Sequence, residues 1–122
     1  MPITLNHTIV PAHDKEAAAR FFARIFGLRF EGASGHFAPV HVNDTLTLLF
    51  DEENAFDSHH YAFHVNDREF DAILRRVKKA NIAFGSAPWS LDDGKPNDWG
   101  GGRGVYFRGP NGHVFELMTV PQ

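Results

Sequence analysis

Blocks of apolar and polar positions in the first half of the chain predict a strand, a helix and three further strands. Residues 5–10 alternate as a strand that ends at Pro11. Asp14 suits a helix N-cap, apolar residues then recur at helical spacing, and Gly27 stands where a C-terminal cap belongs. The strands expected after this helix lie at 28–31, 36–42 and 45–50, the last two joined by a tight turn at Asn43-Asp44.

The same order of elements begins again after residue 58. Residues 59–65 alternate as a strand, and Asp67 is expected to cap a second helix whose apolar stripe ends at Asn81. A short strand near 82–84 precedes a long loop over 85–102. The closing strands are expected at 104–108 and 113–120, joined by the turn Gly109-Pro110-Asn111-Gly112.

This repetition indicates an internal duplication. Shifting the chain by 53 residues places His7 on His60 and Asp14 on Asp67 without a gap. We therefore expect an α+β fold with two βαβββ modules, at about 1–53 and 59–122, in one domain of 1–122. A half of roughly 60 residues buries little core alone, so the modules should pack together or with a second chain.

Charge and composition exclude several classes of protein. The formal net charge of −3 gives no reason to expect nucleic acid or a membrane surface as a partner. No apolar run approaches the roughly 20 residues that span a bilayer, and the amino terminus lacks the features of a signal peptide. The absence of cysteine excludes disulfides and cysteine-ligated zinc. A cytoplasmic protein with a small-molecule ligand fits these observations.

Three segments together resemble one known family. The opening Leu5-Asn6-His7-Thr8-Ile9-Val10, followed by a helix that ends Phe26-Gly27-Leu28, is similar to the start of vicinal oxygen chelate proteins. His60-Tyr61-Ala62-Phe63 is similar to the start of their second module, and residues 104–117 are similar to their closing hairpin. The family includes glyoxalases, bleomycin-resistance proteins and extradiol dioxygenases. The resemblance implies that the modules form an open mixed-sheet barrel and that the protein is a homodimer.

The resemblance also implies a metal site at His7, His60 and Glu116. These positions hold one divalent metal ion in the family, and Fe, Mn, Zn and Ni all stay open here. Two neutral imidazoles and one carboxylate leave other coordination positions to water or substrate. In many relatives each site takes ligands from both chains, so His7 of one protomer is expected to meet His60 and Glu116 of the other.

The sequence differs from two groups of relatives at positions that matter for their activities. Glyoxalase I commonly has a fourth ligand, a glutamate, where this chain has Thr47, so glyoxalase I activity is not expected. The fosfomycin-resistance transferases share the three ligands but add an arginine beyond the last strand. This chain ends at Gln122, so that activity is not favoured.

Further polar and aromatic residues each carry two interpretations. His64 shares a strand face with His60, so it is either a base or proton donor at the site or a histidine satisfied at the strand end. Tyr106 either donates to a metal-bound oxygen or packs in the core. The loop with Trp89 and Trp99 is either a mobile lid over substrate or a disordered connection. Arg103 and Arg108 either bind an anionic group of the substrate or are solvated. The remaining histidines are expected to be structural or at the surface: His13, His36, His41, His59 and His113, the last on the strand face opposite Glu116.

Three functions fit the sequence to different degrees. The ligand set favours a metal-dependent enzyme of dioxygenase, isomerase or lyase type, acting on a small molecule that chelates the metal through oxygens. The alternative is a metal-free protein that sequesters an antibiotic or another small aromatic molecule, as bleomycin-binding relatives do. A purely structural or regulatory dimer has no use for the three ligands.

Overall fold

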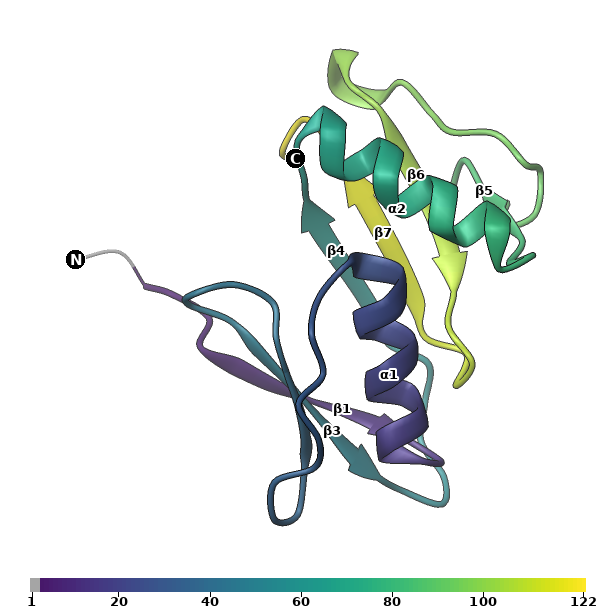
Figure 1. Cartoon of the computed structure of the whole chain (residues 1–122). Helices are drawn as coiled ribbons and strands as arrows, with labels where there is room; N and C mark the ends of the chain where they lie inside the picture. Colours follow the sequence, from purple (N-terminus) through teal and green to yellow (C-terminus); the bar gives the residue numbers. More distant parts are fainter. Residues whose placement is uncertain (1–2) are drawn as a thin grey trace. The chain divides into compact units, whose positions relative to one another are not determined.

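The computed structural model describes residues 3–122, and its contacts divide the chain into two compact units (Figure 1). Unit 1 is Met1–Asp57 and unit 2 is Ser58–Gln122. Each unit has its own sheet and its own α-helix. Neither of these two helices has the length or the apolar run needed to cross a membrane.

Unit 1 places α1 (Lys15–Phe26) on a sheet of β1 (His7–Ala12), β2 (Ala38–His41) and β3 (Thr47–Glu52). The sheet order is β1–β3–β2, in which β3 runs parallel to β1 and antiparallel to β2. The helix has the predicted caps: the Asp14 side chain accepts a hydrogen bond from the Ala17 amide, and Gly27 has a φ of 72°. Phe22 is fully buried and lies 6.0 Å, ring to ring, from Phe50.

In unit 2, as in unit 1, the first strand pairs in parallel with the last, and the sheet has one strand more than that of unit 1. Its elements are β4 (His60–His64), α2 (Asp67–Lys79), β5 (Phe84–Gly85), the 3-10 turn η1 (Trp99–Gly101), β6 (Gly104–Arg108) and β7 (Val114–Met118). The sheet order is β4–β7–β6–β5, with β4 and β7 parallel and the other pairs antiparallel. The prediction of an α+β fold with two βαβββ-like modules is confirmed, and both sheets are mixed and open.

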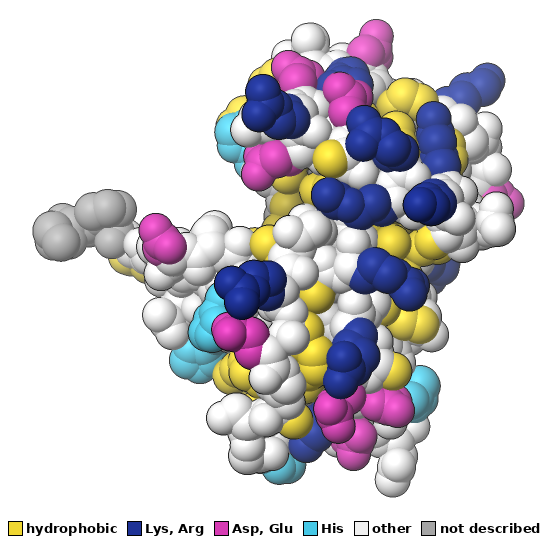
Figure 2. Space-filling model, in the orientation of Figure 1, with side chains coloured by type: hydrophobic (Ala, Val, Ile, Leu, Met, Phe, Trp, Pro, Cys, Tyr) yellow, Lys and Arg dark blue, Asp and Glu magenta, His cyan; other side chains and the backbone are white. Residues whose placement is uncertain are grey.

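The second helix begins one residue earlier in the chain than the 53-residue shift predicts. Its N-cap is Asn66, not Asp67, because Asn66 and Glu69 form a reciprocal capping box. The gapless repeat therefore holds for the strand histidines but not for the caps. Acidic residues in the first turn and basic residues in the last turn match the helix dipole. Figure 2 shows the Lys and Arg side chains gathered over α2, with acidic side chains near its start.

Two further details of the prediction are wrong. Residues 28–31 form no strand: the segment pairs with no other strand, the Arg20 guanidinium lies over the Phe30 ring at 5.1 Å, and Gly32 follows in the left-handed region at a φ of 101°. The hairpin at Asn43-Asp44 is longer than two residues, since the strands end at His41 and resume at Thr47. Asn43 fills this loop by accepting hydrogen bonds from the Thr45 and Leu46 amides.

Alternation along the strands gives the sheet of unit 2 two different faces. Val105, Phe107, Phe115 and Leu117 are all buried on the same side, and the buried stripe of α2 (Phe70, Ile73, Leu74 and Val77) supplies the apolar layer for them. Figure 1 shows α2 lying across this sheet. Each such fully buried side chain stabilises the fold by roughly 1.5–3 kcal/mol. The opposite face carries His60, Tyr106 and Glu116.

Candidate functional site

A histidine and a buried carboxylate meet on the face of the unit 2 sheet opposite that apolar layer. His60 begins β4, and Glu116 lies in the middle of β7, opposite Ala62 in the parallel register. The His60 Nε2 lies 2.9 Å from Glu116 Oε1. The Glu116 side chain is 6% exposed and the His60 side chain is 45% exposed, so the pair is reached from solvent through the imidazole.

Tyr106 completes the polar group around Glu116. It lies opposite Glu116 in the β6–β7 register, and its hydroxyl donates a hydrogen bond to the carboxylate. Burial raises the pKa of Tyr106 well above its ordinary value, and the hydrogen bond and charge of Glu116 raise it further. At neutral pH this phenol is therefore a hydrogen-bond donor. Its ring lies 5.8 Å from the His60 ring.

The two tryptophans of the long loop extend this cluster toward solvent. The Trp99 ring lies 6.0 Å from Tyr106, and the Trp89 ring lies 6.1 Å from Trp99. Hydrogen bonds hold the loop in place: Asp93 accepts from Ser86 and from the Lys95 amide, and Asn97 donates to the Ser86 carbonyl. The segment is an ordered loop rather than a disordered connection.

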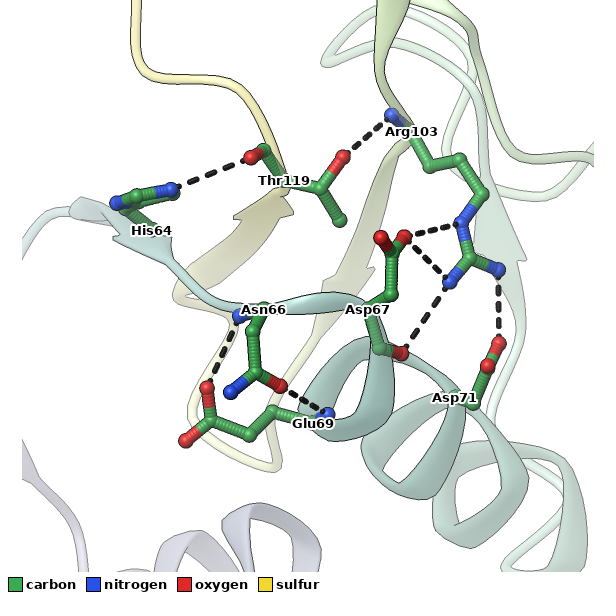
Figure 3. Close-up of polar contacts among 7 residues, drawn as sticks. All are labelled: His64, Asn66, Asp67, Glu69, Asp71, Arg103 and Thr119. Atoms are coloured by element: carbon green, nitrogen blue, oxygen red, sulfur yellow. Dashed lines mark hydrogen bonds and ion pairs between the residues drawn. The ribbon is translucent and has the colours of Figure 1, made fainter.

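His64 lies on the same strand face as His60 but has a different partner. Its Nε2 lies 3.2 Å from the Thr119 carbonyl oxygen, at the end of the strand (Figure 3). This contact matches the interpretation of a histidine satisfied at the strand end. The contact ties β4 to the segment that follows β7. A role for His64 as base or proton donor stays a prediction.

The Arg103 side chain binds α2. Its guanidinium donates to Asp67 Oδ1 at 3.0 Å and to Asp71 Oδ1 at 2.7 Å (Figure 3). The guanidinium also lies over the Phe70 ring, 4.4 Å from its centroid. The Arg103 amide donates to Thr119 Oγ1 at 2.8 Å. These contacts support a structural role for Arg103, and the binding of an anionic substrate group by Arg103 stays a prediction.

Arg108 lies at a separate groove of about 490 Å³ in unit 2. Its guanidinium donates to the Gly112 carbonyl in the β6–β7 turn. Trp89 forms part of the same groove together with Ile82, Ala83, Pro88, Leu91 and Asp92. Arg108 and Trp89, which the sequence suggests as ligand-binding residues, therefore both line a concave surface of the kind that binds small molecules.

In unit 1, His7 is exposed at the start of β1. Its Nδ1 lies 2.8 Å from Asn6 Oδ1, which can only accept, so Nδ1 carries the proton and Nε2 is the nitrogen suited to a metal. Thr47, at the position of the fourth ligand in glyoxalase I, is the direct neighbour of His7 in the β1–β3 register. Thr47 Oγ1 bonds His41 Nδ1 at 2.8 Å, a contact that the sequence analysis missed because it depends on strand register.

The remaining histidines occupy structural or surface positions. His36 pairs with Asp51 at 2.9 Å, and the His59 Nδ1 lies 2.9 Å from the Tyr61 hydroxyl. His113 is buried before the start of β7, where its Nδ1 accepts a hydrogen bond from the His59 amide at 2.9 Å. His113 stands directly before β7, and its ring lies 5.8 Å from that of Tyr61, whose register partner is Phe115, so His113 lies on the side of the sheet opposite Glu116, as expected.

The chemistry of the donor set fits a divalent ion. Glu116 supplies a buried negative charge, and the His60 imidazole adjoins it at hydrogen-bond distance, so both side chains can turn their donor atoms to one cation. Within residues 3–122 no three His, Asp or Glu side chains already form a group able to hold a metal. Unit 2 thus brings two of the three predicted ligands together, and His7 belongs to unit 1.

The comparison with known proteins decides the family. The Glyoxalase/Bleomycin resistance protein/Dioxygenase superfamily profile matches residues 4–117. The chain belongs to this superfamily. The motifs of the opening strand, the second module and the closing hairpin therefore predict the family correctly.

Superfamily members of known structure include two that are similar over nearly the whole chain. Oxidase ChaP-H2 is 42% identical, with a TM-score of 0.93, over 99% of this chain and 96% of its own. Oxidase ChaP-H1 is 40% identical, with a TM-score of 0.92, over 98% of both chains. A curated relative, metallothiol transferase FosB of Lysinibacillus sphaericus, is 24% identical over 95% of this chain and 82% of its own length.

Proposed function

We propose that the chain is a divalent-metal-dependent oxidase of the superfamily, acting on a small molecule that chelates the metal through two oxygens. The observation that carries the proposal is the His60–Glu116 pair at 2.9 Å, with its carboxylate buried beneath an exposed imidazole. Oxidative chemistry is favoured over isomerase or lyase chemistry because the relatives with 40% and 42% identity are named oxidases. A set of two histidines and one carboxylate also suits iron(II) and oxygen chemistry.

Each residue of the proposed site has a defined task. Glu116 supplies the negative ligand, and His60 and His7 supply imidazole nitrogens. The bound ion would act as a Lewis acid with open positions for substrate oxygens. Tyr106 would turn its single hydroxyl donor from Glu116 to a substrate oxygen once the carboxylate held the ion, and its raised pKa keeps the phenol protonated. Trp99, whose ring meets that of Tyr106 edge-on at 6.0 Å, would form an aromatic wall for the substrate.

A second candidate function is metal-free sequestration of an aromatic molecule. The groove beside Trp89 and Arg108 favours it, because that surface offers an exposed ring and a cation without involving Glu116. The two functions differ in whether a metal binds at Glu116. Metal binding is therefore the deciding property.

Calorimetric titration of the metal-free, untagged protein with zinc, manganese, nickel and anaerobic iron(II) tests the proposal. We expect one site per chain, with binding strongly weakened in Glu116→Gln because that change removes the only negative ligand. Asp51→Asn is a matched control, since His36 and Asp51 form a pair with the same 2.9 Å spacing away from the family positions. Equal affinity in the wild type and Glu116→Gln would leave sequestration as the better account.

A further inference from the structure

One wall of the groove at Arg108 is a loop segment packed directly on the sheet of unit 2. A Cβ atom at Gly85 in β5 would overlap the Ser90 carbonyl oxygen and lie 2.7 Å from the Leu91 Cα, so the loop crosses β5 where only glycine fits. A tight turn, closed by a 2.9 Å hydrogen bond from the Ser90 amide, carries Trp89. The groove is therefore shaped by the packed backbone and does not depend on a ligand to form it.

The lining of the groove is apolar apart from two charged side chains. Trp89 is 81% exposed, whereas tryptophan rings in folded proteins are mostly buried. An open ring beside a groove of about 490 Å³ can stack on a flat ring of a ligand. The apolar residues of the lining are Ile82, Ala83, Pro88, Trp89 and Leu91.

Arg108 brings a positive charge to this lining. Its guanidinium donates to the Gly112 carbonyl at 3.0 Å, which fixes the side chain but does not neutralise its charge. Across residues 3–122 no carboxylate pairs with Arg108, whereas Arg103 binds both Asp67 and Asp71. The remaining donors of a guanidinium form a planar fork that matches a carboxylate. Arg108 is thus suited to hold an anionic group of a ligand.

Asp92 limits how much negative charge the groove accepts. It borders the same groove, its side chain is exposed, and it does not pair with Arg108. Like charges at short range repel each other, so a second anionic group on the ligand would be disfavoured. The two charged residues together favour a ligand with a single negative charge.

We propose that this groove binds a flat aromatic molecule that carries one carboxylate. The aromatic ring stacks on Trp89, the carboxylate accepts hydrogen bonds from Arg108, and Asp92 discriminates against ligands with two carboxylates. Neither His60 nor Glu116 takes part. The site therefore goes beyond the proposed metal-dependent function and does not rest on it.

Calorimetry with 2-naphthoate and 2-naphthamide on metal-free protein, in the presence of a chelator, tests the proposal. The two probes have the same rings and differ in charge. We expect 2-naphthoate to bind roughly tenfold more tightly, because hydrogen bonds to charged groups are the stronger ones. Arg108→Gln should weaken the binding of 2-naphthoate alone and so abolish the preference. Lys79→Gln, which removes an equal charge from α2 outside the groove, should retain it.

Two further variants separate the tasks of the ring and of the acidic residue. Trp89→Ala should weaken the binding of both probes by a similar factor, because it removes the stacking surface. Naphthalene-2,6-dicarboxylate should bind the wild type more weakly than 2-naphthoate does, and Asp92→Asn should narrow this difference. Circular dichroism checks that every variant is folded.

Three results would overturn the proposal: no binding of either probe by the wild type, equal binding of both, or a preference for 2-naphthoate that survives in Arg108→Gln. Glu116→Gln should bind 2-naphthoate as the wild type does. A failure of this site and a failure of the metal site at Glu116 are therefore separate results.

Discussion

Glu116 is the residue on which the site depends, because a carboxylate in this position is costly without partners. Burial of an unpaired charge disfavours folding, and here the charge is offset by hydrogen bonds from His60 and Tyr106. Among the residues described, no buried side-chain nitrogen or oxygen lacks a partner. A cation that replaced the His60 proton would fit this arrangement, and its binding should release protons.

The stability of the fold at alkaline pH should depend on Tyr106. The folded-state pKa of Tyr106 lies above its ordinary value of 10.0, so above pH 10.0 the unfolded chain loses the phenolic proton first. Stability is therefore fully present below pH 10.0 and falls as the pH rises beyond it. In Tyr106→Phe the urea midpoint should fall less steeply as the pH rises. The fall that remains should come from Tyr61, because burial raises the pKa of Tyr61 as well. Parallel curves for the wild type and the variant would contradict this assignment.

The sequence predicts individual residues well where a family motif or strand alternation defines them. His60 and Glu116 come from motifs, and the structure brings them together. The partners of His7, His41 and His64 were not predicted, because these contacts depend on side-chain orientation, on strand register and on a backbone carbonyl that no spacing rule reports. The groove at Arg108 could not be predicted from the sequence either, because its shape depends on the path of a long loop.

At the scale of elements, Arg103 joins three parts of unit 2. Its backbone binds Thr119 after β7, its side chain binds Asp67 and Asp71 of α2, and it stands directly before β6. The planar guanidinium contacts both carboxylates at once through donors held in a fixed fork, a geometry that the compact ammonium group of lysine does not reproduce. The clamp therefore fixes the end of the loop that carries Trp99.

Replacing Arg103 should loosen this clamp. Arg103→Gln should lower the urea midpoint of unfolding at neutral pH. The midpoint of Arg103→Lys should lie between those of Arg103→Gln and the wild type. The hydrogen bond from Arg103 lowers the pKa of Asp71 below its ordinary 3.8. The contribution is thus present above pH 3.8 and is lost as the pH falls through the lower folded value. A difference between Arg103→Gln and wild type that stays constant below pH 3.8 would exclude this origin.

Helix positions were predictable from sequence, but one strand and one cap were not. Periodicity and the Asp14 cap locate α1 correctly. Asp67 suits an N-cap by residue type, and the repeat aligns it with Asp14, but the reciprocal capping box of Asn66 and Glu69 sets the start of α2 one residue earlier. Residues 28–31 alternate but have no backbone partner, so alternation alone was not enough to predict a strand there.

At the scale of the whole molecule, the two units share a topology that fits duplication. In each unit the first strand begins at the aligned histidine and pairs in parallel with the last strand. Ile3, Leu5 and Ile9 occupy alternate positions leading into and along β1, an edge strand, and all three are exposed. An uncovered apolar edge of this kind invites pairing with a second chain.

We therefore propose a homodimer, as the family resemblance implies. Sedimentation velocity at micromolar protein should show a dimer, and Leu5→Asp should shift the population toward monomer because it places a charge in the apolar edge. A wild-type protein that sediments as a stable monomer at micromolar concentration would contradict the proposed homodimer. The same experiment with Trp89→Ala, which alters exposed apolar surface in unit 2, should leave the dimer intact.

The central claim is that Glu116 and His60 bind a metal, and anomalous diffraction from crystals grown with the bound ion tests it most directly. We predict one strong anomalous peak at about 2.0–2.2 Å from His60 Nε2 and a Glu116 carboxylate oxygen, with His7 of the same or the second chain as third ligand. A peak at His36 and Asp51, or any site in which Glu116 does not contact the metal, would contradict the account.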